Sequence, residues 1–193
     1  TLQNEIGEVR AASIPFGVNL FAPNPVPISE AAYRRYAHAV QREADRYGLT
    51  LPTAPVEDDD AFGAKVDMLL TDPVPVVSFT FGLPGNDVIT ALRKAGTVVV
   101  QTVTTRPEAE AAVAAGADML AVQAAAAGGH SGTFTPDRLP APMRIDDLVR
   151  KVTGSVAVPV IAAGGLATAE AVSGVLAAGA VAAAVGTVLL RAD

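Results

Sequence analysis

The chain has 193 residues, a length that suits one domain with a sizeable hydrophobic core. Half of the residues are hydrophobic, only 5% are aromatic and none is tryptophan, so the core must be built from Ala, Val, Leu and Ile, as in a parallel sheet covered by helices. The formal net charge of −6, with 14 scattered basic residues, argues against nucleic acid as a partner, and the absence of cysteine excludes disulfides and thiolate chemistry.

The chain opens with an expected helix and an expected strand. Leu2, Ile6 and Val9 recur at helical spacing, which predicts an amphipathic helix. A strand is predicted over residues 14–21, followed by a stiff proline-rich loop over 23–27. No apolar run in the chain approaches the roughly 20 residues of a membrane-spanning helix. We therefore expect no membrane partner, and the lack of cysteine fits a cytoplasmic location.

A second helix is predicted after Ser29, which is a suitable N-cap, and Gly48 should end it. His38 lies on this helix without a second metal ligand or a carboxylate at i±4, so we interpret it as a surface residue. The helix carries an apolar stripe that consists of Tyr33, Tyr36, Val40 and Tyr47.

Residues 49–62 read as an acidic, proline-containing surface insertion. They contain Pro52, Pro55 and the acidic run 57–60. A carboxylate cluster can bind a cation, but this one lacks the glycine and the terminal glutamate of an EF-hand loop. We therefore expect a solvated loop and no metal site.

From residue 62 onward, predicted helices and strands alternate regularly. Helices are expected over 62–70, around 88–95, over 107–115, over 145–152 and after Thr168, and strands over 75–82, 97–103, 118–123, 158–165 and 181–186, with a last helix beginning at Thr187. Residues 135–143 form a proline-rich excursion that is long enough to cover a site.

This alternation predicts a parallel sheet with right-handed crossovers, either doubly wound or closed into a barrel. The similar helix ends at 114–118 and 177–181 favour a barrel of repeating units. Six units are present where a (β/α)8 barrel has eight, so we expect residues 1–193 to form a single partial TIM-barrel domain. We also expect the natural chain to be longer at both ends, with the first strands absent here.

The loop after the strand 118–123 is the first candidate site. It runs from Gln123 through Gly128, Gly129 and His130, which is one of two histidines in the chain. Loops at the carboxyl ends of parallel strands carry the chemistry of such folds, because the sheet below holds them rigid. The same residues are also compatible with a tight turn that exposes a histidine.

Two further glycine loops follow the next two strands. Gly164 and Gly165 end one strand, and Gly186 and Thr187 end the other. Adjacent loops of this kind can bring backbone N–H groups together around a phosphate, and no lysine accompanies them. The patterns of a P-loop, a dinucleotide fingerprint and a hydrolase elbow are absent. The glycines could also serve only as turns.

Together these residues resemble the nitronate monooxygenases, formerly called 2-nitropropane dioxygenases. The similar motifs occur in the same order over nearly the whole chain, at 15–21, 77–82, 102–105, 127–132, 159–165 and 185–187. The resemblance implies an FMN-dependent (β/α)8 barrel that uses O2 to oxidise alkyl nitronates to a carbonyl compound and nitrite. It leaves open whether nitroalkanes are substrates as well.

The resemblance also implies roles for individual residues. His130 corresponds to the catalytic histidine beside the flavin, and Gln123 corresponds to a glutamine that contacts the flavin. The loop glycines Gly128 and Gly129 match those of the family. By the same resemblance, the FMN phosphate would be held by Gly164, Gly165, Gly186 and Thr187.

This sequence departs from the family pattern at a few positions. The family often has Gly and Glu where Ala124 and Ala126 stand, and Gln just before the last Gly-Thr pair, where this chain has Ala184 and Val185. These differences bear on the subclass more than on FMN binding. A homodimer is left open.

Two alternatives remain beside the nitronate oxidase. One is the related FMN-dependent enoyl-acyl-carrier-protein reductase, which has a similar glycine-glycine-histidine loop and would use NAD(P)H. The other is a flavin- or phosphate-binding barrel without catalysis, which the presence of His130 disfavours.

Overall fold

The computed structural model describes residues 1–24 and 26–191. Pro25 of the predicted loop 23–27 and the last two residues of the predicted final helix lie outside the described residues. Within the described part of the chain, no helix is long and apolar enough to cross a membrane.

Within residues 1–24 and 26–191, six parallel strands form one sheet in which every strand pairs with the next one along the chain. They are β1 (Gly17–Phe21), β2 (Val76–Thr80), β3 (Val98–Val103), β4 (Met119–Gln123), β5 (Val160–Ala163) and β6 (Ala182–Ala184). Parallel strands in sequence order are the arrangement of a (β/α)8 barrel. The predicted α/β fold is therefore confirmed.

Each of the six strands is shorter than predicted. The first begins at Gly17, three residues after the expected start, because Pro15 has no N–H to offer a neighbouring strand and Ser13 has φ 55°. The strand predicted over 158–165 covers Val160–Ala163, since Gly164 and Gly165 already have positive φ and belong to the loop. The carboxyl end of β5 is thus fixed by the backbone conformation of the glycines that follow it.

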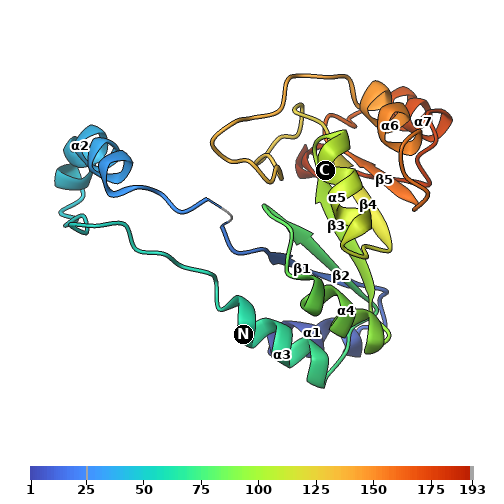
Figure 1. The fold of residues 1–193 in the computed structure, drawn as a ribbon, viewed down its shortest axis with the longest axis horizontal. Helices are drawn as coiled ribbons and strands as arrows, with labels where there is room; N and C mark the ends of the chain where they lie inside the picture. Colours follow the sequence, from blue (N-terminus) through green and yellow to red (C-terminus); the bar gives the residue numbers. More distant parts are fainter. Residues whose placement is uncertain (25, 192–193) are drawn as a thin grey trace.

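Seven α-helices and a 3-10 helix accompany the sheet in the described chain (Figure 1). They are α1 (Leu2–Ala11), α2 (Glu30–Arg46), α3 (Phe62–Thr71), α4 (Asn86–Lys94), α5 (Arg106–Ala114), α6 (Ile145–Thr153), α7 (Ala169–Ala177) and η1 (Thr187–Arg191). Ser29 and Thr168 cap α2 and α7 as predicted, because their hydroxyls accept hydrogen bonds from Ala32 N and Ala171 N at 3.2 Å.

The helix-to-strand turns repeat one geometry, which supports the prediction of repeated units. Gly96, Gly116 and Gly179 all have φ between 89° and 107°, a region that favours glycine. In each case the next residue donates its N–H to a carbonyl five residues back, as Ala117 does to Ala112. The same turn therefore leads into β3, β4 and β6.

The strands bury one face under the helices. Val18 and Leu20 are buried, whereas Asn19 between them faces the other side, as the alternation predicts. One hydrophobic cluster joins β1–β3 to α1, α3 and α4, and a second joins β3–β5 to α5, α6 and α7. The opposite face carries polar groups, since Ser78 Oγ and Thr80 Oγ1 donate to Asn19 Oδ1 at 2.9 and 3.0 Å.

Helix α2 lies apart from the sheet, at the end of two long connections (Figure 1). Its stripe residues Tyr36 and Tyr47 are 61% and 68% exposed, and Ala44 is the buried residue of this helix. His38 is exposed, as predicted. Residues 49–61 contain neither helix nor strand in the structure.

The core should be sensitive to cavities. Leu92 in α4 is fully buried, so we expect Leu92→Ala to lower the free energy of unfolding by about 2–5 kcal/mol. Urea denaturation of the full chain would measure the change. Leu49→Ala is the matched control, because Leu49 is 61% exposed and should contribute less than about 0.5 kcal/mol. Equal losses in the two variants would contradict this packing.

Candidate functional site

The loop after β4 presents His130 at the carboxyl edge of the sheet. The imidazole is exposed and lies edge-on to the Phe81 ring, with 5.9 Å between ring centroids. Phe81 follows β2 and in turn packs on Phe21 at the end of β1, with centroids 4.9 Å apart. The predicted catalytic histidine therefore lies beside an aromatic pair that sequence analysis did not single out.

Phe81 has an unusual backbone conformation, with φ 73°. Positive φ is rare for a bulky residue and costs on the order of 1–3 kcal/mol, and such residues concentrate at functional sites. The predicted strand 75–82 ends at Thr80 for this reason. The kink turns the Phe81 ring toward His130, so the residue that ends the strand also forms a wall of the site.

Gln123, the last residue of β4, anchors the loop that carries His130. Its Nε2 donates to the carbonyl oxygen of His130 at 3.2 Å, and its Oε1 accepts from Gly132 N at 2.7 Å. Both the nitrogen and the oxygen of the Gln123 amide therefore hydrogen-bond to the backbone of this loop. The predicted contact between Gln123 and the flavin stays a prediction.

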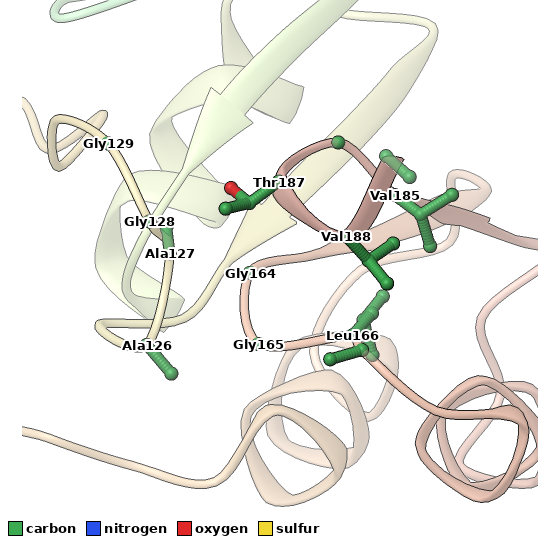
Figure 2. Close-up of a pocket in the computed structure, with 13 residues that line it drawn as sticks. Ala126, Ala127, Gly128, Gly129, Gly164, Gly165, Leu166, Val185, Thr187 and Val188 are labelled. Atoms are coloured by element: carbon green, nitrogen blue, oxygen red, sulfur yellow. The ribbon is translucent and has the colours of Figure 1, made fainter. Parts of the chain in front are cut away.

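The glycine loops line a cavity of about 580 Å³ at the ends of β5 and β6 (Figure 2). This volume suits a cofactor-sized ligand. Thirteen residues line it, and they fall in the segments 126–129, 164–167 and 184–188. The predicted residues Gly128, Gly129, Gly164, Gly165, Gly186 and Thr187 are therefore brought together in one place.

Close approaches explain why glycine stands at two of these positions. A Cβ on Gly128 would meet Thr187 Oγ1 at 2.6 Å, and a Cβ on Gly164 would meet the carbonyl oxygen of Ala124 at 2.9 Å. Figure 2 shows the Thr187 side chain turned toward Gly128. Side chains at these positions would push the loops apart and change the shape of the cavity.

The cavity is uncharged. Thr187 is the single residue with a polar side chain among the thirteen that line it, and the remainder are Gly, Ala, Leu and Val. Leu166 and Val188 point toward one another inside it (Figure 2). A phosphate bound here would rely on backbone N–H groups and the Thr187 hydroxyl. The residues present thus fit the phosphate end of FMN.

Charged groups lie just outside this cavity. The pKa of Glu170 in the first turn of α7 is lowered, because its own backbone N–H and the Thr168 hydroxyl hydrogen-bond to the carboxylate. Arg144 lowers the pKa of Asp146 by a hydrogen bond, and Asp146 raises the pKa of Arg144. These groups line a neighbouring hollow of about 320 Å³ that shares Gly164 and Gly165 with the main cavity.

His130 and Gln123 do not line the glycine cavity. Gln123 is the last residue of β4, and His130 lies in the same loop as Gly128 but packs on Phe81, which follows β2. A smaller hollow of about 320 Å³ on that side is lined by Phe21, Phe81, Ser131 and others. Among the described residues, no group of three or more His, Asp or Glu could hold a metal ion.

Known proteins resemble the whole chain. Residues 1–193 match the family model described as Nitronate monooxygenase. The nitronate monooxygenase of Paraburkholderia phytofirmans is 36% identical over 186 residues, which cover 94% of this chain and 51% of that protein. The chain thus spans about half the length of the curated relatives that it matches.

Solved structures give the same result. A nitroalkane oxidase from Streptomyces ansochromogenes superposes with a TM-score of 0.85 at 42% identity, over 95% of this chain and 53% of that one. FabK from Thermotoga maritima superposes with a TM-score of 0.67 at 29% identity, over 98% of this chain and 47% of that one.

Proposed function

Since the chain belongs to the nitronate monooxygenase family, we propose that it binds FMN and oxidises alkyl nitronates with O2 to a carbonyl compound and nitrite. The proposal is carried by one observation, the uncharged glycine cavity that opens on the same loop as His130. The nitroalkane oxidase from Streptomyces ansochromogenes supports this reaction class for the related fold.

The glycine cavity is the proposed seat of the cofactor. Gly164, Gly165, Gly186 and Thr187 would hold the phosphate of FMN through backbone N–H groups and one hydroxyl, with Gly128 and Gly129 closing the loop above them. When bound, FMN supplies the electron transfer between the substrate and O2, and the protein orients the reactants and excludes water.

His130 is proposed to act on the substrate directly. A nitronate is an anion with its charge shared by carbon and the nitro oxygens, so a protonated imidazole can donate a hydrogen bond to an oxygen. A neutral imidazole can instead take the α-proton from a nitroalkane, which makes the nitronate in place. The exposed position of His130 leaves its ring free to reach a substrate.

Phe81 and Phe21 would complete this side of the site. Phe81 packs on the imidazole in a T-shaped contact, and the two phenylalanine rings offer an apolar surface to an alkyl substituent. This surface suits a substrate with an apolar chain next to its nitro group.

An aerobic assay tests the proposed function. The FMN-loaded protein should release nitrite from an alkyl nitronate in the absence of NADH and NADPH. The alternative reductase would be supported if NADH bleached the flavin rapidly while nitronate left the spectrum unchanged. A protein that takes up no FMN would contradict both enzymatic readings.

A further inference from the structure

We propose that Glu108 is a positioning residue for His130, which it controls through Thr133 and Phe134. The role of His130 is itself part of the proposed function, but the tether that Glu108 makes can be tested without it. Glu108 belongs to α5 and not to the loop after β4.

Glu108 is a buried carboxylate, 7% exposed, in the first turn of α5. Its Oε1 accepts from Thr133 Oγ1 at 2.7 Å and from Phe134 N at 2.8 Å. Its Oε2 accepts from Thr104 N at 2.6 Å and from Thr104 Oγ1 at 2.8 Å. Each oxygen therefore receives one backbone N–H and one hydroxyl, so the carboxylate joins the end of β3 to the loop that follows His130.

The four bonds make a carboxylate the suitable group at this position. A buried carboxylate is costly unless donors satisfy it, and here four donors do so. A glutamine here would turn its NH2 group toward the backbone N–H of either Thr104 or Phe134, depending on the orientation of the amide. Two donors would then face each other. The first turn of a helix also favours a negative charge.

The loop is held from a second side by Gln123, whose amide bonds His130 O and Gly132 N. Gly132 is pressed into the sheet, since a Cβ there would meet Thr102 Cγ2 at 2.7 Å. Of the five residues 130–134, four are therefore hydrogen-bonded to Gln123 or Glu108.

His130 depends on this anchoring because its own side chain has little support. The imidazole is exposed, and it makes a T-shaped contact with the Phe81 ring. The buried segment begins two residues later, at Gly132 and Thr133. The position of the imidazole thus follows the backbone that Glu108 and Gln123 fix, and a displacement of about 1 Å can cost up to 10²-fold in rate.

The test uses a pair of variants at the Glu108 contact in the FMN-loaded protein. Thr133→Val removes the hydroxyl and keeps the branched shape, whereas Thr133→Ser keeps the hydroxyl. Thr153→Val is the matched control, because the Thr153 hydroxyl makes a hydrogen bond of 2.9 Å to Val149 O on α6, in another part of the fold. Glu108→Gln is a fourth variant, and it should loosen the same segment as Thr133→Val.

Amide hydrogen exchange of residues 131–134 is the first measurement. Thr133→Val should exchange roughly 5- to 10-fold faster in this segment, because it loses the buried hydrogen bond to Glu108 and two hydrogen bonds of 3.2 Å between the Thr133 hydroxyl and Thr135. Thr133→Ser and Thr153→Val should match the wild type. Unchanged exchange in Thr133→Val would overturn the inference, whether or not the protein oxidises nitronates.

The second measurement is the ratio of activity on a neutral nitroalkane to activity on its preformed nitronate. Thr133→Val should lower this ratio on the order of 10-fold with FMN retained, because proton removal needs the imidazole in place. Thr133→Ser should restore the ratio, and Thr153→Val should not change it. A loosened loop with an unchanged ratio would overturn the link to His130, whereas a wild type inactive on both substrates would refute the proposed function and leave the exchange result standing.

Discussion

His130→Asn is expected to lower the activity on neutral nitroalkanes by roughly 10²- to 10⁴-fold, the usual contribution of a positioned acid–base group. Asparagine keeps a hydrogen-bonding side chain, so the FMN spectrum should be unchanged. Activity on preformed nitronates should fall less, because a nitronate has already lost its α-proton and only the electrostatic contribution of the histidine is removed. Steady-state kinetics with both substrate forms would measure the difference.

The chain offers a matched control for this change. His38, the other histidine, is exposed on α2, which lies apart from the sheet. We expect His38→Asn to keep wild-type activity on both substrates. If His130→Asn showed a small and equal loss on the two substrates with FMN intact, His130 would serve only to shape the loop.

Gly186→Val is expected to abolish FMN retention while the chain still folds. Gly186 lines the glycine cavity, and an added Cβ there would meet no protein atom within 4 Å. The new Cβ itself would thus clash with a bound ligand and not with the protein. Flavin content per chain after gel filtration, together with the circular dichroism spectrum, would measure the effect.

Gly63→Val is the control, because a Cβ at Gly63 in α3 also meets no protein atom within 4 Å and this residue does not line the cavity. It should keep bound flavin. Gly165→Val should lose the cofactor too, but it is less selective, since Gly165 has φ 75° and the new Cβ would lie 3.0 Å from Ala126 Cβ. Wild-type flavin stoichiometry in Gly186→Val would refute the phosphate site.

Much of the fold could be predicted from local patterns. The alternation of apolar strands with capped helices predicted the parallel sheet, and helix caps such as Ser29 and Thr168 were found because a single hydroxyl and its spacing define them. The three loops that carry the glycines could be placed on one edge, because parallel strands end on the same side. Their shared cavity follows from this arrangement.

Other features depend on contacts between distant residues, and sequence patterns do not carry them. Glu108 looks like an ordinary first-turn acid of a helix, yet its partners Thr133 and Phe134 are 25 and 26 residues away. The backbone of Phe81 cannot be read from its type, since φ 73° is unfavourable for phenylalanine. Helix α2 was predicted correctly, but the exposure of Tyr36 and Tyr47 depends on where the helix lies.

The central claim, that FMN held by its phosphate at the glycine cavity would be reduced by a nitronate next to His130, is tested most directly by an anaerobic absorption spectrum. The FMN-loaded protein is mixed with an alkyl nitronate in the absence of O2 and of pyridine nucleotides. We predict that the flavin absorbance near its oxidised maximum is bleached, and that it returns when O2 is admitted. An oxidised spectrum that persists with excess nitronate, in a protein with full FMN content, would contradict the claim.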